Sequence, residues 1–442
     1  MSHYKPYPAY KDSGVEWLGR VPEYWQLKPL KYVGSAIIGL TYSPDDLVSE
    51  NEGTLVLRSS NIQNGRIFFG DNVFVNTKIP RALVTRLGDI LICSRNGSRA
   101  LIGKNALIDS ASVGISFGAF TTVFRSSANA FVYYVLNSEL FRFQSGRFLT
   151  TTINQLTTET LNSFEIPLPP PAEQLQIASS LDRETARIDA LIEKKTRFIE
   201  LLREKRQALI THAVTKGLDP SAKMKDSGVE WLGEVPEHWS VKHLKHVVDP
   251  NSSITYGIVQ AGPEYEGGVP YIRTSDMSGD ELPVSGYPLT SPEVDESYAR
   301  SRVRPGDIVM SIRASVGKCL PVPDELSLAN LTQGTAKVSP GQNVTRDFLL
   351  EFLNSGAAQV YFELMAKGAT FKEITLDALR RTPVLLPPRD EQVGIDRFIA
   401  LHVGRLDRLV RLSECSVVTL KERRCALITA AVTGQIDLRE VV

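Results

Sequence analysis

Two polar loops carry the side chains with the most evident chemistry. Residues 94–99 read Ser-Arg-Asn-Gly-Ser-Arg, and residues 311–318 read Ser-Ile-Arg-Ala-Ser-Val-Gly-Lys. Each loop follows a short apolar run, at 90–92 and at 308–310, which predicts a buried strand. Arginine can fork onto guanine, amides can bind adenine, and hydroxyl groups can bind phosphate oxygens. The residue types therefore favour contact with nucleic acid, against the alternative of a solvated surface whose charges pair locally.

A second pair of loops repeats the pattern. Residues 55–62 and 269–277 each begin with an apolar run and end in an Arg-(Ser/Thr)-Ser-(Asn/Asp) turn. A later loop at 367–373 contains Phe371 and has a rough match around Arg147 and Asn154. By position, the candidate DNA contacts are Arg58, Ser59, Asn61, Arg95, Asn96, Ser98, Arg99, Arg273, Thr274, Asp276, Arg313, Ser315 and Lys318, with Lys367 and Lys372 as weaker candidates.

Basic residues cluster around both polar loops, although 50 Lys and Arg residues balance 50 Asp and Glu residues over the whole chain. Within 78–104 the only acid is Asp89, and within 300–318 the only acid is Asp307. The zero net charge shows no overall basic field. Either run alone favours a solvated, locally paired surface, but two aligned runs, each on a loop after a strand, support contact with nucleic acid equally well. Their basic residues are Lys78, Arg81, Arg86, Arg95, Arg99 and Lys104, and Arg300, Arg302, Arg304, Arg313 and Lys318.

Familiar catalytic motifs cannot be assembled from this sequence. The Gly-Lys ending of 97–104 has the wrong spacing for a P-loop, and Asn105 stands where Ser or Thr would hold magnesium. A nuclease-like pairing of Pro44-Asp45 with residues 193–195 places its second half inside a predicted helix, so we interpret it as coincidence. No Ser/His/Asp set arises from positions that match between the two halves. We therefore predict no catalytic residues.

A metal site and a membrane partner are also not expected. Three histidines cluster at 238–246, but the first copy of this segment has Tyr or Pro at the corresponding positions. The N-terminus lacks the apolar core of a signal peptide, and no run of eighteen apolar residues occurs, so we expect a soluble cytoplasmic protein. The four cysteines have no metal-ligand spacing and fit free thiols in a reducing compartment: Cys93, Cys319, Cys415 and Cys425.

The loops must be positioned by elements that the chain contains twice. Residues 11–33, which begin KDSGVEWLGRVPEYW, recur as residues 225–247, which begin KDSGVEWLGEVPEHW, 214 positions later (225 − 11). We call both copies the short repeat. This near-identity is the strongest signal in the sequence. Its tryptophans, Trp17 and Trp25 in the first copy, are expected to anchor small cores, with stacking on a partner as the alternative.

Residues 172–215 predict one long helix, because they contain no Gly or Pro and follow three prolines. The stretch recurs 218 positions later (391 − 173), where Glu173 becomes Glu391. A helix of this length would run roughly 65 Å. Neither copy can bury its apolar seam alone, so we expect the two to pack antiparallel. The expected seam residues are Ile177, Leu181, Ile188, Leu191, Phe198, Leu202, Leu209, Ile395, Ile399, Leu406, Leu409, Leu420 and Leu427, with Ile192, Ile199 and Ile210 widening it.

Together these features resemble the specificity (S) subunit of type I restriction-modification enzymes. Four motifs carry the resemblance, in the same order twice over nearly the whole chain: KDSGVEWLGxVPExW, the Arg-(Ser/Thr)-Ser-(Asn/Asp) turn, the Gly-Asp-Ile strand at 88–90 and 306–308, and Leu-Pro-Pro-x-x-Glu-Gln before the long helix. Each motif alone is weak, and their order makes the resemblance specific.

The resemblance implies an α+β fold, with two α/β target recognition domains separated by two long helices that form an antiparallel coiled coil, in a pseudo-twofold internal repeat. Each target recognition domain would read one half of a split DNA site, and the helices would set the spacing of the halves. The expected parts are residues 1–170 and 225–387 for the two recognition domains, 171–216 and 388–437 for the spacer helices, and 217–224 for a linker.

The resemblance further implies a subunit with no catalytic activity of its own. Two methyltransferase (M) subunits would dock on it and bring S-adenosylmethionine, and nuclease/translocase (R) subunits would join them with ATP and Mg²⁺. This chain itself would bind double-stranded DNA and no cofactor. Two alternatives remain: a scaffold whose blocks bind peptides, and an enzyme such as a divergent nuclease whose site the sequence does not reveal.

Overall fold

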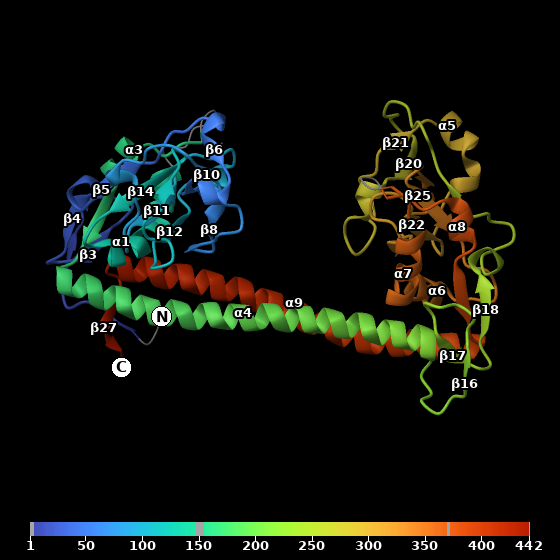
Figure 1. The fold of residues 1–442 in the computed structure, drawn as a ribbon. Helices are drawn as coiled ribbons and strands as arrows, with labels where there is room; N and C mark the ends of the chain where they lie inside the picture. Colours follow the sequence, from blue (N-terminus) through green and yellow to red (C-terminus); the bar gives the residue numbers. More distant parts are fainter. Residues whose placement is uncertain (1–3, 147–153, 369–371, 442) are drawn as a thin grey trace. The chain divides into compact units, whose positions relative to one another are not determined.

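The computed structural model describes residues 4–146, 154–368 and 372–441, and the chain divides into two compact units (Figure 1). Unit 1 comprises Met1–Thr196 with Cys415–Val442, and unit 2 comprises Arg197–Glu414. Each unit contains one short repeat, one globular block and part of both long helices. The division follows the internal repeat, with its boundary inside the helices.

Unit 1 contains two four-stranded sheets. The first is antiparallel, in the order β12 (Asn105–Leu107), β11 (Ile90–Cys93), β14 (Thr121–Arg125) and β5 (Ser35–Ile38). The second has the order β13 (Ser116–Phe117), β7 (Thr54–Leu57), β10 (Phe74–Val75) and β6 (Leu47–Val48), with β13 parallel to β7. All four residues of β11 are buried, as the apolar run predicts for a strand covered on both faces. The predicted loops begin where β7 and β11 end.

Unit 2 repeats this topology. One sheet has the order β19 (Thr255–Tyr256), β25 (Thr335–Val338), β22 (Ile308–Ser311) and β23 (Cys319–Pro321). The other has the order β21 (Leu289–Thr290), β20 (Val269–Ile272) and β24 (Asn330–Leu331), with β20 parallel to β24. Between β21 and β22 the chain inserts α5 (Pro292–Ser297), so the blocks diverge at their edges and share their central strands.

The sequence pattern around 131–143 and 348–365 predicts one short helix after the sheets of each block, and in the structure each of these patterns contains a break. Residues 131–143 fall on α1 (Asn129–Leu136) and α2 (Glu139–Gly146). Residues 348–365 fall on α6 (Arg346–Asn354) and α7 (Gly356–Met365), where the Ser355 side chain accepts a hydrogen bond from Ala358 and caps the second helix. A further short helix, α3 (Thr158–Ser163) or α8 (Leu376–Arg380), completes each block.

The two long helices are α4 (Pro171–Lys216) and α9 (Arg389–Val432). In unit 1, Arg424 of α9 pairs with Asp189 of α4 at 2.8 Å. In unit 2, Arg206 of α4 pairs with Asp407 of α9 at 3.0 Å, so later residues of one helix meet earlier residues of the other. The predicted α+β class, with two long helices that pack together, is confirmed.

Helix α9 ends at Val432, earlier than the predicted residue 437. Gly434 adopts a positive φ of 72°, which ends the helix, and the chain continues as β27 (Asp437–Val441). Strand β27 pairs with β1 (Tyr4–Lys5). The end of the chain therefore contributes a strand to unit 1 in place of a final helical turn.

Most of the predicted seam residues are buried or partly buried, but three are exposed. Leu191, Phe198 and Leu409 are 44%, 45% and 44% exposed, so their assignment to the seam is wrong. At 3.6 residues per turn the seam passes through the neighbouring positions Ile192 and Ile199, of which Ile199 is buried. The buried seam residues are Ile177, Leu181, Ile188, Leu202, Ile395, Ile399, Leu406 and Leu427, and Leu209 and Leu420 are partly buried.

The short repeat anchors each unit on the start of a long helix. Trp25 and Trp239 are fully buried, as predicted for core anchors. The indole N–H of Trp25 donates to the Glu173 carboxylate at 3.2 Å, and that of Trp239 donates to Glu391 at 2.9 Å. This contact explains why the short repeat and the Glu-Gln pair recur together.

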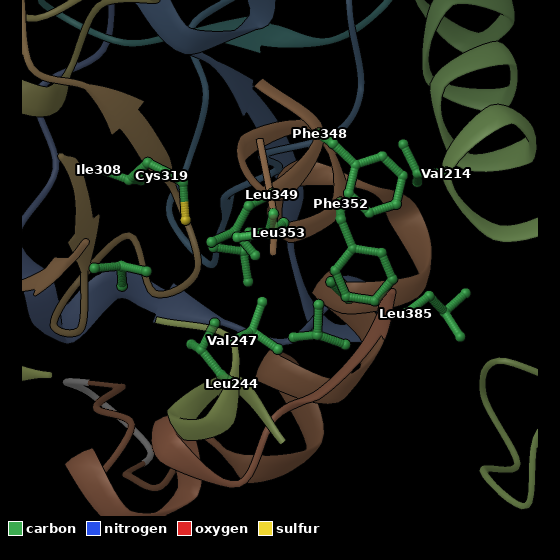
Figure 2. Close-up of a cluster of buried hydrophobic side chains, with 14 of the residues drawn as sticks. Val214, Leu244, Val247, Ile308, Cys319, Phe348, Leu349, Phe352, Leu353 and Leu385 are labelled. Atoms are coloured by element: carbon green, nitrogen blue, oxygen red, sulfur yellow. The ribbon is translucent and has the colours of Figure 1, made fainter. Parts of the chain in front are cut away.

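The core of unit 2 shows how these parts meet (Figure 2). Leu244 follows the short-repeat strand β18 (Ser240–His243), which pairs with β26 (Pro383–Leu386) just before α9. Val214 near the end of α4 and Phe348 of α6 pack in the same cluster. In unit 1, β4 (Gln26–Pro29) pairs with β15 (Glu165–Leu168) in the same way. Among the described residues, no helix is long and apolar enough to cross a membrane.

Candidate nucleic-acid interface

In unit 1, the loops after β7 and β11 lie together. The backbone N–H groups of Ser94 and Arg95 both donate to the carbonyl of Phe120 at 3.0 Å, just before β14. The Asn96 amide donates to the Ser59 hydroxyl at 3.3 Å and so joins the two predicted loops. We call the following residues the unit 1 loop cluster: Arg58, Ser59, Arg95, Asn96 and Phe120.

The arginines of unit 1 differ in their partners. Arg95 lies over the ring of Phe120, with its guanidinium carbon 5.3 Å from the ring centroid. Arg99 donates to the carbonyl of Gly146 at 3.2 Å. Within the described residues neither forms an ion pair, whereas Arg58 pairs with Asp71 at 2.6 Å. Two exposed cations therefore remain without a carboxylate partner.

Asn61 does not face solvent. Its side chain is 0% exposed, its Oδ1 accepts from the backbone N–H of Arg58 at 2.8 Å, and its amide donates to the Phe68 carbonyl at 2.9 Å. The prediction that Asn61 contacts DNA is therefore wrong, because the side chain closes the turn that presents Arg58 and Ser59. Asn96 also serves its loop, since its Oδ1 accepts from the N–H of Ser98, which is exposed.

Unit 2 builds its loops with the same backbone connections. Ile312 N–H donates to the Gly334 carbonyl at 2.9 Å, as Ser94 does to Phe120 in unit 1. Arg313 forms an isolated bridge with Glu373, as Arg95 does with Gln155. The Arg313 and Glu373 side chains form an ion pair at 3.1 Å. We call the following residues the unit 2 loop cluster: Arg273, Thr274, Arg313, Lys372 and Glu373.

The remaining candidates of unit 2 lie around this cluster. Asp276 accepts from the backbone N–H of Arg273 at 2.8 Å and pairs with its guanidinium at 2.9 Å, so it stabilises the turn as Asn61 does. Lys318 donates to two carbonyls, those of Ser278 and Gly279, at 3.2 and 2.6 Å. Ser315 and Lys367 are exposed. Phe371 and Arg147 lie outside the described residues.

The acids inside the basic runs have structural partners. Asp89 binds the Arg125 guanidinium at 2.9 and 2.7 Å and accepts from the N–H of Arg86, which holds the Gly-Asp turn before β11. In unit 2, Arg302 pairs with Asp295, which lies outside the basic run, at 2.5 Å. In unit 1 the acid of the basic run is therefore neutralised by Arg125 from outside the run, whereas in unit 2 Arg302 and Arg313 of the run itself are paired with carboxylates.

The chemistry available at the clusters is that of hydrogen bonding and charge. Burial raises the pKa of the Cys93 thiol behind the unit 1 cluster, and burial raises that of Cys319 in unit 2, so both stay protonated at neutral pH. Among the described residues, no group of three or more His, Cys, Asp or Glu side chains is placed to hold a metal ion.

Sequence reasoning missed three residues of this interface. Phe120 stood in a Gly-Ala-Phe-Thr-Thr stretch without a polar signal, and only the tertiary fold places it under Arg95. Asp71 lies thirteen residues after its partner Arg58, beyond any local pattern. Glu373 directly follows Lys372 in the loop 367–373, which the sequence analysis had selected. Its place in that loop is the signal that could have identified it.

A protein-family model supports a relationship over most of the chain. The family described as the type I restriction modification DNA specificity domain matches residues 22–201 and again residues 236–406. The two matches cover both blocks, most of α4 and the first part of α9.

Curated relatives match over similar extents. The specificity subunit of the type I restriction enzyme EcoKI from Escherichia coli strain K12 is 25% identical, over 95% of this chain and 90% of that subunit. The putative MjaX specificity subunit of Methanocaldococcus jannaschii is 26% identical, over 96% of each chain. The EcoBI specificity subunit of Escherichia coli is 26% identical over 65% of this chain and 61% of its own length.

Solved structures share the fold. A chain from a study of complex assembly and conformational transition of the type I R-M system superposes with a TM-score of 0.70 and 20% identity, covering 94% of this chain and 99% of that one. The HsdS subunit from Thermoanaerobacter tengcongensis gives a TM-score of 0.51 with 20% identity, over 94% and 98% of the two chains.

Proposed function

Because this chain belongs to the type I restriction-modification DNA specificity family, we propose that each of its units reads one half of a two-part DNA target through its loop cluster. One observation carries this proposal. The chain builds the same loop connections twice, after β11 and after β22, and each places an arginine at the same position, Arg95 or Arg313.

The polar groups in and beside the loop clusters fit the chemistry of a DNA groove. Arg95, Ser98 and Arg99 offer donors that can reach guanine edges and phosphates. In unit 2, Thr274, Arg313 and Lys372 offer the same kinds of group. Asn61 and Asp276 act in this proposal as positioning residues.

Specificity subunits of type I systems act on DNA together with M and R subunits, and we propose that this chain binds two M subunits. A mostly apolar groove in unit 1 is lined by Glu422, Ala426 and Thr429 of α9. A groove in unit 2 is lined by the residues 218 positions earlier in α4, where Ala208 corresponds to Ala426 and Thr211 to Thr429. Two surfaces built from the same repeat positions suit two copies of one partner.

The grooves also share their supports. The N–H of Glu139, at the start of α2, donates to the Thr429 hydroxyl at 3.0 Å. The N–H of Gly356, at the start of α7, donates to Thr211 at 2.9 Å. In this proposal S-adenosylmethionine binds to the M subunits, and ATP with Mg²⁺ binds to the R subunits. This chain contributes no catalytic group, and the complex works in the cytoplasm, where it meets DNA.

The stoichiometry is tested by native mass spectrometry of the co-expressed complex. Ala208→Arg and Ala426→Arg should each reduce the bound methyltransferase from two copies to one, and the double variant should bind none. Ala190→Arg, at an exposed position of α4 outside both grooves, is the control and should keep two copies. Two bound copies in the double variant would contradict the assignment of the grooves.

The DNA-reading role is tested by expressing the chain with its methyltransferase in a host without such activity and mapping methylated adenines by single-molecule sequencing. We expect one motif made of two short specific halves with a fixed unspecific gap. An assembled complex that methylates no defined motif would contradict the proposed function.

A further inference from the structure

Phe120 is an exposed aromatic side chain on a rigid backbone. It is 59% exposed, yet its carbonyl accepts three hydrogen bonds, from Ser94 N–H and Arg95 N–H at 3.0 Å and from Ser94 Oγ at 3.1 Å. The residue directly precedes β14, the central strand next to β11. The fold therefore holds an apolar ring at a fixed place in the unit 1 loop cluster.

The ring also positions a cation. The Arg95 guanidinium lies 5.3 Å from the ring centroid, and no carboxylate among the described residues competes for it. An arginine stacked on an aromatic ring keeps its donor edge free for a planar acceptor. Arg95 and Phe120 thus present a donor fork and an apolar surface side by side.

Unit 2 has a glycine where unit 1 has the aromatic ring. The residue in the place of Phe120 is Gly334, whose carbonyl accepts from Ile312 N–H at 2.9 Å. A Cβ atom at Gly334 would lie 2.4 Å from the Thr274 hydroxyl oxygen, so a larger side chain would require the Thr274 side chain to move. Among the described residues, Arg313 pairs with Glu373 and has no aromatic ring beside it. The two units therefore share a backbone and differ in chemistry at this position.

We propose that Phe120 determines specificity in the half-site read by unit 1, where its ring contacts the C5-methyl group of a thymine next to the base bound by Arg95. The thymine methyl is the apolar group that the major groove presents, and Phe is a side chain that contacts it. This inference rests on the proposed function, because it assumes that the unit 1 loop cluster faces DNA. The inference requires a thymine in the half-site read by unit 1. It requires none in the half-site read by unit 2, because Gly334 has no side chain to contact a methyl group.

The test uses the complex of the full chain with its methyltransferase and duplexes that contain the mapped target. Each thymine of the target is replaced singly by deoxyuridine, which removes only the methyl group. At one position of the unit 1 half-site, the wild-type complex should bind about fourfold more weakly, the loss expected for one buried methyl group. Phe120→Gly should bind the thymine duplex no more tightly than the wild type binds the deoxyuridine duplex. Replacing that thymine by deoxyuridine should not change the binding of Phe120→Gly.

Two controls separate this effect from misfolding. Leu87→Ala changes another exposed apolar residue of unit 1. Leu87 lies in the turn before β11, at the opposite end of that strand from the loop cluster, so this variant should bind DNA as the wild type does. Phe120→Gly should still discriminate bases in the unit 2 half-site as the wild type does. The half-site of unit 1 is the one whose specificity Arg95→Ala relaxes.

Three results would overturn the inference while leaving the proposed function intact: a unit 1 half-site without thymine, deoxyuridine tolerated by the wild type at every position, or equal deoxyuridine sensitivity in Phe120→Gly and wild type. Failure of the wild-type complex to recognise any two-part target is a different outcome, and it would overturn the proposed function itself.

Discussion

At the scale of single residues, ion pairs decide which arginines of the loop clusters a ligand can reach. Arg58, Arg273 and Arg313 each have a carboxylate partner, whereas Arg95 and Arg99 have none among the described residues. Exposed pairs of this kind add little to stability. Their main consequence is to orient a guanidinium and to offset its charge.

The substitution Glu373→Gln gives unit 2 the residue type that unit 1 has at Gln155. Because Arg313 loses its carboxylate partner, we expect stronger binding to non-specific duplex and a slope of log K against log salt that is steeper by up to about 1. Salt titration of the methyltransferase complex measures this slope. Asp377→Asn, which breaks the exposed pair between Asp377 of α8 and Arg381 just after that helix, is the control and should leave the slope unchanged. Equal slopes for wild type and Glu373→Gln would show that Arg313 does not meet DNA.

The buried carboxylate of Glu173 supports a second prediction at this scale. It accepts hydrogen bonds from Trp25, Tyr7 and Tyr24, and its side chain is 4% exposed. Glu173→Ala leaves these donors without an acceptor and should lower the free energy of unfolding by about 3 kcal/mol. Glu391→Ala should cost less, because the Glu391 side chain is 42% exposed and water can replace it. Urea unfolding measures both, and equal losses would contradict this account.

Residue types alone indicated the interface but could not separate contacts from supports. Arg, Asn and Ser in a loop after a strand predicted a polar surface, and Arg95 and Ser98 are exposed there. Asn61 is also a polar residue in a loop after a strand, yet its side-chain amide closes the turn through hydrogen bonds and does not face solvent. Phe120 had no polar signal at all. Such differences depend on hydrogen bonds between distant segments, which a local pattern does not contain.

At the scale of elements, the long helices could be predicted better than the short ones. The absence of Gly and Pro fixed the extent of α4, and the second copy predicted α9 except for its last turns. The seam could be predicted only in part. Where two apolar residues are adjacent, such as Leu191 and Ile192, either one fits the helical spacing of the seam, and only the packing of the second helix decides which is buried. The breaks within the short helical patterns depend on a single residue, Ser355 in unit 2, which a search for apolar periodicity passes over.

The helices also carry a prediction about spacing. Deleting residues 192–198 from α4 and 415–421 from α9 removes one heptad from each helix and leaves the pairs Asp189–Arg424 and Arg206–Asp407 in place. Each helix becomes roughly 10 Å shorter, about the rise of three base pairs. We expect the unspecific gap of the methylated motif to shorten while both halves keep their sequence. An unchanged gap would contradict a spacer role, and deletion from one helix alone should impair assembly because it breaks the register.

At the scale of the whole molecule, the chain is one plan used twice with different surfaces. Gly217 and Gly434 both have positive φ, 77° and 72°, and both lie against the tryptophan of a short repeat, where an added Cβ would be 3.3 Å from the Trp239 or Trp25 ring. After α4 the chain continues through a linker, and after α9 it ends in β27, which pairs with β1. The repeat and its order could be predicted from sequence because near-identical segments mark both copies. The target could not, because the two copies carry different side chains in the loop clusters that we propose meet DNA, such as Phe120 and Gly334.

The most direct test of this account compares the methylated motifs produced by the wild type, Arg95→Ala and Arg313→Ala, each expressed with the methyltransferase and mapped by single-molecule sequencing. We predict that the wild type yields one two-part motif, that Arg95→Ala relaxes bases in one half only, and that Arg313→Ala relaxes bases in the other half only. If both substitutions altered the same half, or if neither altered the motif, then the central claim that each unit reads its own half-site would be wrong.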